Sequence, residues 1–162
     1  MTQWTIRVAT VQDAATLAEL AAALNAHFGV ENTAALNGDS LAAVMRGDDP
    51  LVFGYLGESD GLPVAYALCQ KFFDTDTGTM ATWLHDLYVD PLHRSGGLGR
   101  RLLARVAADA ARKGQCCIGL AVYEDNPARH LYDRIGAALP TDALVYELRD
   151  DKLDKLAREA QL

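Results

Sequence analysis

The chain has 162 residues, of which 50% are apolar, and its 22 acidic and 15 basic side chains give a net charge of −7. This length predicts one domain spanning 1–162, and the apolar fraction excludes wholesale disorder. No apolar run reaches the roughly 18 residues of a membrane span, and no secretory signal pattern opens the chain. The three cysteines argue against a disulfide framework. We therefore expect a cytoplasmic protein with no membrane partner.

Charge is unevenly distributed. Residues 93–113 hold six basic side chains and one acidic one, which leaves the rest of the chain strongly acidic. This pattern argues against nucleic-acid binding and favours one anionic ligand at the basic segment and a cationic partner elsewhere. A helix that is basic only on its solvent side is the simpler alternative.

The first half of the chain predicts an N-terminal strand and a capped helix. Trp4–Ala9 alternates in polarity as a strand does, and Thr10 and Asp13 form a capping-box pattern before an Ala- and Leu-rich helix that reaches about His27. Glycine and asparagine predict a loop over 29–39. The next elements are a short helix at 40–46, strands at 51–56, 64–73 and 79–89, and turns at 57–63 and 74–78.

The second half predicts helices that alternate with strands. A loop over 90–99 opens a helix that Gly114 ends. Cys116–Tyr123 is apolar throughout, as in a buried strand, and Asn126 followed by Pro127 predicts a helix start. The last predicted elements are a strand at 144–148 and a charged helix at 150–162. This order predicts a mixed α/β sheet covered by helices.

The strongest motif is the loop Arg94-Ser95-Gly96-Gly97-Leu98-Gly99, which lies between a predicted strand and a predicted helix. Glycines allow a tight turn and close approach of the backbone to a ligand. Backbone amides at a helix N-terminus attract anions, and the neighbouring Arg100 and Arg101 add positive charge. A pyrophosphate is the expected ligand, and a glycine-rich helix entry without a ligand is the alternative.

Three phosphate-binding patterns compete for this loop. A P-loop needs Lys followed by Ser or Thr where this chain has Arg100 and Arg101, so that pattern is excluded. The dinucleotide fingerprint needs a different glycine spacing early in a βαβ unit. Arg94, Gly97 and Gly99 match the Arg/Gln-x-x-Gly-x-Gly/Ala loop of the GNAT acetyltransferases.

A second motif strengthens this resemblance. The segment 84–103 resembles the GNAT pyrophosphate motif, and 124–137 resembles the motif in which Asn126 opens a helix that carries Tyr132 and ends at a glycine. The resemblance implies the GNAT fold, a mixed and mostly antiparallel central sheet flanked by helices. The segment 83–89 is most similar to the diamine and thialysine acetyltransferase branch, which is typically homodimeric. That branch has Glu where this chain has His85, which leaves the acceptor open.

The resemblance also implies a reaction and a set of site residues. An acetyl group would pass directly from acetyl-CoA to a primary amine in a ternary complex, with no metal. The pyrophosphate would lie on the loop amides, and the pantetheine arm would pair with the backbone of the preceding strand. The implied cofactor-binding residues are Leu87, Tyr88, Val89, Arg94, Ser95, Gly96, Gly97, Leu98, Gly99, Arg100 and Asn126.

The chemistry demands a base and an acid. An alkylamine has a pKa of about 10.4, so its deprotonation at pH 7 costs about 4.6 kcal/mol. We expect Asp86 to hold the cationic amine and His85 to act as the base. In an unbroken strand these side chains face opposite ways, and only a bulge lets both reach the amine. Tyr132 occupies the family position for the acid that protonates the thiolate. The simpler alternatives are an exposed strand-end histidine and a packed tyrosine.

Other candidates carry weaker expectations. Three acids in predicted loops could border an amine pocket, although solvated turn residues are the simpler interpretation: Glu31, Asp74 and Asp76. Three cysteines in apolar strands are expected in the core: Cys69, Cys116 and Cys117. The histidines and cysteines lack metal-ligand spacing.

The sequence therefore predicts an acetyl-CoA-dependent N-acetyltransferase that acts on a polyamine or lysine-like amine. The alternatives are an aminoglycoside or a protein amine as acceptor, or an acyl-CoA sensor without catalysis. Retention of Tyr132 argues against the sensor, since a binding protein needs no acid at that position.

Overall fold

The structure is a computed structural model that describes residues 4–30, 36–140 and 145–160. Contacts divide the chain into two compact units, Met1–Glu124 and Asp125–Leu162, and each is described by itself. Among the described residues, no helix has the length and apolar character needed to cross a membrane.

The first unit is built on a five-stranded sheet in the order β1-β2-β3-β4-β5. Neighbouring strands from β1 to β4 are antiparallel, whereas β5 runs parallel to β4. This mixed, mostly antiparallel sheet confirms the predicted fold class. The strands are β1 Trp4–Val8, β2 Val52–Ser59, β3 Leu62–Asp74, β4 Thr79–Val89 and β5 Ile118–Leu120.

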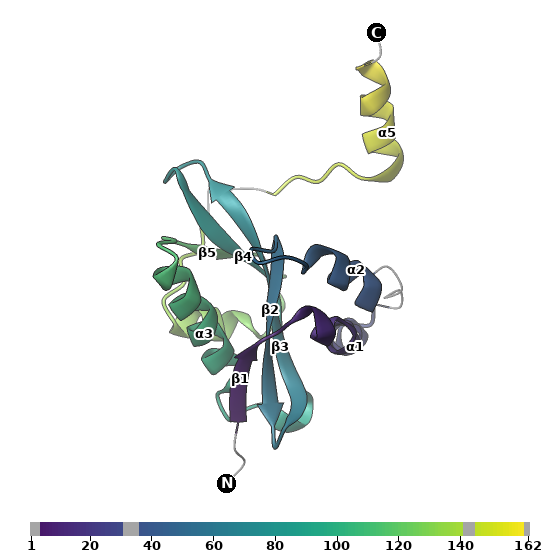
Figure 1. Ribbon diagram of the computed structural model, residues 1–162. Coiled ribbons are helices and arrows are strands. Elements are labelled where there is room, and N and C mark those ends of the chain that lie inside the picture. The colour runs from purple at the N-terminus through teal and green to yellow at the C-terminus, as the bar shows by residue number, and fades with distance from the viewer. Residues whose placement is uncertain (1–3, 31–35, 141–144, 161–162) are drawn as a thin grey trace. The chain divides into compact units, whose positions relative to one another are not determined.

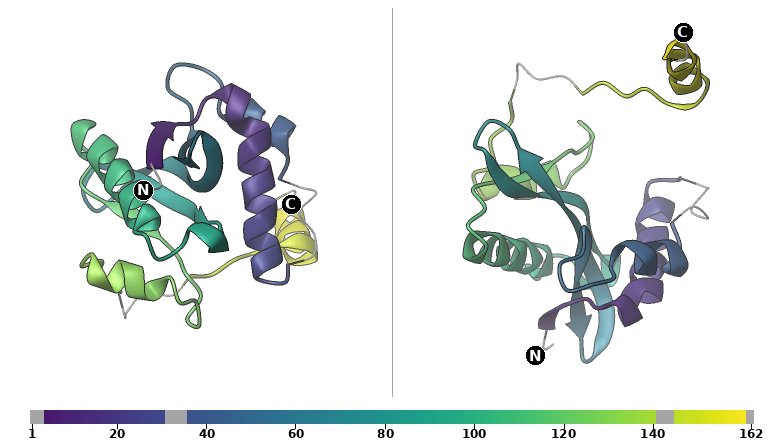
Figure 2. Two further views of the ribbon diagram at one scale, coloured as in Figure 1. Left: turned by 90° about the horizontal axis from the view of Figure 1, so that it is seen from below. Right: turned by 45° about the horizontal axis from the view of Figure 1, so that its top comes forward.

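Helices cover both faces of this sheet (Figures 1 and 2). α1 (Ala14–His27) and α2 (Gly38–Val44) lie on one face, and α3 (Leu98–Arg112) lies on the other. Short 3₁₀ turns, η1 (Val11–Asp13) and η2 (Pro91–His93), precede α1 and α3. The second unit holds α4 (Arg129–Arg134) and α5 (Asp150–Glu159).

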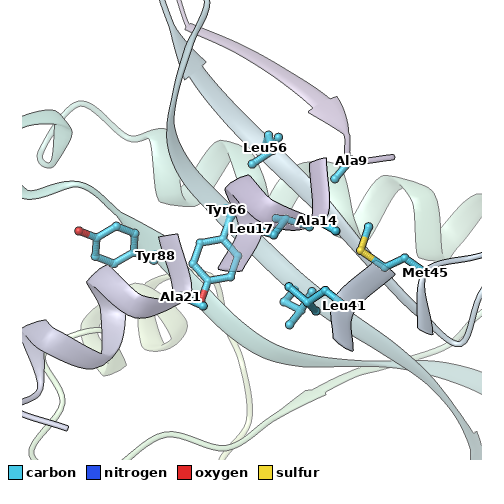
Figure 3. Close-up of a cluster of buried hydrophobic side chains, with 10 residues drawn as sticks. Ala9, Ala14, Leu17, Ala21, Leu41, Met45, Leu56, Tyr66 and Tyr88 are labelled. Carbon is cyan, nitrogen blue, oxygen red and sulfur yellow. The ribbon is translucent and has the colours of Figure 1, made fainter. Parts of the chain in front are cut away.

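A buried apolar cluster joins α1 and α2 to the sheet (Figure 3). Leu17 of α1 and Leu41 of α2 pack in one cluster with Leu56, Tyr66 and Tyr88 from three adjacent strands. Side chains alternate between the two faces of a strand, so the residues that flank Leu56, Tyr66 and Tyr88 along their strands point toward α3. The cluster fixes the α1-facing surface of β3 and β4, on which the candidate site is built.

The predicted capping box and the predicted end of the first helix are confirmed, and the structure adds a contact between Asp13 and Arg7. Thr10 and Asp13 form the expected capping box, and α1 ends at His27. Both carboxylate oxygens of Asp13 also accept hydrogen bonds from the Arg7 guanidinium, each at 2.8 Å. These bonds hold the pKa of Asp13 well below its usual range. Asp13 thus joins β1 to the start of α1.

Strand ends are where the sequence-based expectations were wrong. β2 continues to Ser59 because the ladder with β1 and β3 extends almost to the turn, which is confined to Asp60 and Gly61. The apolar segment Cys116–Tyr123 forms only the short, half-buried strand β5. Residues 145–148 form no strand, and Leu144 lies outside the described residues.

The cysteines and loop acids also differ from expectation in part. All three cysteines are free thiols, as expected, and Cys69 is buried. Cys116 is exposed and Cys117 half-buried, because both precede β5 and lie outside the ladder. Asp74 caps its own turn, accepting hydrogen bonds from the Asp76 amide and the Thr77 hydroxyl. Glu31 lies outside the described residues.

We predict that Asp13→Asn lowers the free energy of unfolding by about 1–2 kcal/mol at pH 7, because the charge-assisted bonds to Arg7 are lost. The lowered pKa of Asp13 stabilises the fold above the ordinary aspartate pKa of about 3.9, and this contribution fades as the pH falls below it. Urea unfolding should therefore show a constant difference between the two proteins from pH 7 to pH 5 and a smaller one below pH 4. A difference that does not change with pH would contradict this assignment.

Candidate active site

A β-bulge in β4 determines where the two candidate catalytic side chains point. Along the β3–β4 ladder, Leu68 lies opposite Asp86 and Cys69 lies opposite Leu84, so His85 has no partner of its own. A bulge of this kind turns a side chain out of the normal alternation. The structure thus contains the bulge that His85 and Asp86 need if both are to reach one site.

Hydrogen bonds confirm that His85 and Asp86 point to the same face. The Tyr66 hydroxyl donates to Asp86 Oδ2 at 3.0 Å, and His85 Nε2 lies 2.9 Å from Gln70 Oε1. Tyr66 and Gln70 are four residues apart on β3, so their side chains share a face. This is the face that carries α1 and α2, because Tyr66 belongs to the buried cluster.

The two side chains differ in their electrostatic surroundings. His85 is exposed, whereas Asp86 is half-buried. Burial raises the pKa of Asp86, and the Tyr66 hydrogen bond and the nearby His85 oppose that shift only in part. Burial also raises the pKa of Tyr66, which therefore stays a hydrogen-bond donor. A positive charge beside Asp86 would offset its desolvation, so the pair suits a cationic ligand.

The outer edge of β4 is open beyond the bulge. β4 and β5 pair only from Thr82–Leu84 to Ile118–Leu120. In the described part of the chain, no strand pairs with this edge of β4 past Leu84. Leu87, Tyr88 and Val89 continue along β4, paired through their other edge to β3. Apart from the Val89 carbonyl, which accepts a hydrogen bond from Arg94, their outward-facing backbone groups are available to an extended ligand, as predicted for the pantetheine arm.

The glycine loop adopts the conformation that the motif predicts. Ser95 and Gly97 have left-handed backbones, with φ of 70° and 84°, and Gly97 caps α3. The Arg101 amide donates to the Gly97 carbonyl at 3.0 Å. The amides of Leu98, Gly99 and Arg100 precede this bond, so they have no acceptor within the helix. The loop therefore presents a row of backbone donors at a helix N-terminus, which suits a pyrophosphate.

Two side chains brace this loop from outside. The Arg94 Nε donates to the Val89 carbonyl at 2.8 Å, and its Nη1 lies 3.3 Å from His27 Nε2 at the end of α1. Arg94 thus ties the loop to β4 and α1 by its side chain. Trp4 packs against Gly96, where an added Cβ would lie 1.8 Å from the ring. Sequence reasoning missed Trp4, since nothing in the pattern of an N-terminal strand indicates contact with a distant loop.

The remaining candidate residues named from the sequence lie in the second unit, which is described by itself. Asn126 Oδ1 accepts a hydrogen bond from the Ala128 amide at 2.8 Å, and the Arg129 amide donates to the Asn126 carbonyl at 3.1 Å. Asn126 thus opens the turn that leads to α4, as expected, although regular helix begins only at Arg129. Tyr132 lies in α4. Gly136 has a left-handed backbone just after it, which ends the helix as predicted.

Comparisons with known proteins agree with this geometry. The model of the acetyltransferase (GNAT) family matches residues 17–137. A thialysine N-epsilon-acetyltransferase of Mus musculus is 40% identical over 83 residues, which cover 50% of this chain and 48% of that protein. The ribosomal protein bS18 alanine N-acetyltransferase of Haemophilus influenzae is 32% identical over 73 residues, covering 45% of this chain and 46% of that protein.

A solved structure extends the similarity to nearly the whole chain. An aminoglycoside N-acetyltransferase in complex with CoA superposes with a TM-score of 0.74 over 93% of this chain and 97% of its own, at 16% identity. That likeness shows a shared fold. The matched region spans about half the length of the curated relatives. The chain belongs to the GNAT acetyltransferase family, since the family model covers most of its length.

We predict that Gly97→Ala lowers the free energy of unfolding by about 1–2 kcal/mol, because an alanine resists the left-handed backbone of that residue. The open space around Gly97 leaves backbone strain as the cause. Ser95→Gly is the matched control, since it relieves the same strain two residues away and should not destabilise the protein. Equal losses of stability in both variants, measured by urea unfolding, would contradict this account.

Proposed function

We propose that this protein is an N-acetyltransferase that transfers the acetyl group of acetyl-CoA to a primary amine of a small cationic acceptor, either a polyamine or a lysine-like molecule. The observation that carries the proposal is the bulge, which places His85 and Asp86 on one face of the strand that leads into the glycine loop. The name of the mouse relative supports a lysine-like acceptor.

The first unit offers backbone groups that fit acetyl-CoA. The amides at the start of α3 would bind its pyrophosphate, and the open edge of β4 along Leu87–Val89 would pair with its pantetheine arm. Bound in this way, acetyl-CoA supplies an electrophilic thioester carbonyl. By the family resemblance, Asn126 is proposed to contact acetyl-CoA near the start of its helix.

His85 and Asp86 would prepare the acceptor. The carboxylate of Asp86 attracts the acceptor ammonium, whose charge in turn offsets the burial of that carboxylate. The His85 imidazole takes one proton from the ammonium, directly or through water. The free amine then forms a C–N bond to the acetyl carbon as the C–S bond breaks, and the acylated nitrogen releases its second proton to water, which replaces the proton given up by the acid. Tyr132 is proposed to donate its hydroxyl proton to the departing thiolate.

The proposal is tested by titrating acetyl-CoA calorimetrically and then measuring thiol release over an amine panel. The panel contains spermidine, lysine and thialysine, with an aminoglycoside and a peptide bearing an N-terminal alanine as alternatives suggested by the relatives. We expect acetyl-CoA binding and thiol release with at least one of the first three. Binding without thiol release on any amine would instead indicate a sensor, and release with only the last two would exclude the proposed acceptor class.

Two variants separate the proposed acid from the proposed base. Tyr132→Phe should lower kcat by roughly 10²-fold while CoA affinity stays nearly unchanged, because only the hydroxyl is removed. His85→Ala should lower the rate chiefly near neutral pH and recover in part at high pH, where free amine is abundant. An unchanged rate in the first variant, or a loss independent of pH in the second, would refute the corresponding role.

A further inference from the structure

Gln70 is the β3 residue whose side chain contacts His85. It lies opposite Trp83 in the ladder, and the bulge brings His85 Nε2 to 2.9 Å from its amide oxygen. The reaction described above assigns Gln70 no role. Gln70 is half-buried, whereas His85 is exposed.

The contact has a consequence for the protonation of the imidazole. A neutral imidazole carries one N–H and one free lone pair, and an amide oxygen can only accept a hydrogen bond. A bond between Gln70 Oε1 and His85 Nε2 therefore places the proton on Nε2 and the lone pair on Nδ1. We propose that Gln70 is a positioning residue that holds His85 in the Nε2–H tautomer. Nδ1 is then the nitrogen that takes the proton from the substrate amine. The inference rests on the proposed role of His85 as the base.

The same bond can persist while the imidazole takes up a proton. Proton transfer moves a proton from the ammonium of the substrate to Nδ1 and leaves Nε2–H hydrogen-bonded to Gln70 throughout. The bond becomes charge-assisted and stronger once the ring is cationic. Gln70 should thus keep the ring oriented before and after the proton is transferred. Asp86 adjoins this ring on β4, and its carboxylate accepts a hydrogen bond from the Tyr66 hydroxyl of β3. Lys71, also on β3, pairs with Asp49.

The tautomer can be observed without catalysis, by long-range ¹H–¹⁵N correlation spectra of the full ¹⁵N-labelled chain. The chain has four histidines, so the His85 signals are assigned by their loss in His85→Ala. Above the pH at which His85 titrates, we expect a protonated Nε2 and an unprotonated Nδ1. In Gln70→Leu we expect a mixture of tautomers, because the amide oxygen that accepts the Nε2–H hydrogen bond is gone while the size of the side chain is nearly kept.

Two further variants complete the design. Gln70→Glu should keep the Nε2–H tautomer, since a carboxylate, like the amide oxygen, only accepts hydrogen bonds. Its negative charge should move the acid limb of the pH profile of kcat/KM to higher pH by about one unit. Gln12→Leu is the matched control, because Gln12 is an exposed residue of η1. It should leave both the spectrum of His85 and the pH profile unchanged. Gln70→Leu should lower kcat by about tenfold.

The outcomes distinguish this inference from the proposed function. A protonated Nδ1 in the wild-type protein would overturn the inference, because it would mean that the Gln70 amide donates to Nε2. An unchanged tautomer in Gln70→Leu would overturn it as well. Absence of acetyl transfer to every amine would refute the proposed function, while the spectra would still decide whether Gln70 fixes the tautomer.

Discussion

One extra residue in β4 sets the geometry on which the candidate site depends. A regular strand would turn His85 and Asp86 to opposite faces, one toward α1 and the other toward α3. The bulge places both on the α1-facing surface, where β3 supplies a hydrogen-bond partner for each. The pairing of β4 with β5 ends at Leu84, the residue immediately before the bulge. The position of the proposed catalytic pair and the opening of the strand edge thus coincide.

The buried cluster and the glycine loop meet at the end of the same strand. Tyr88 packs in the cluster under α1, and the Arg94 guanidinium lies 5.8 Å from its ring centroid. Arg94 also bonds to Val89 and contacts His27, so the loop that is proposed to hold the pyrophosphate is anchored to the core of the first unit. One strand thus connects the proposed acceptor side of the site with the proposed cofactor side, which limits how far one can shift relative to the other.

Local patterns predicted much of this arrangement. The features that they did not predict depend on contacts between residues distant in the chain. The capping box at Thr10, the span of β4 and the start of α3 depend on residues close in sequence, so the sequence predicted them well. The bulge depends on how β4 meets β3, and the sequence could only name it as a condition for both side chains to act. The roles of Gln70 and Trp4 arise from contacts between residues distant in the chain, and no local pattern indicates them. The apolar run around β5 predicted a longer strand because composition does not reveal where a neighbouring strand stops pairing.

The contact between Trp4 and Gly96 has a practical consequence. The protein has two tryptophans, and they lie in the two parts of the first unit that matter most: Trp4 against the glycine loop, and Trp83 on β4 beside the bulge. Replacing either one by phenylalanine leaves a single intrinsic fluorophore. Emission from the remaining indole would then report separately on the glycine loop or on the bulged part of β4, without any added label.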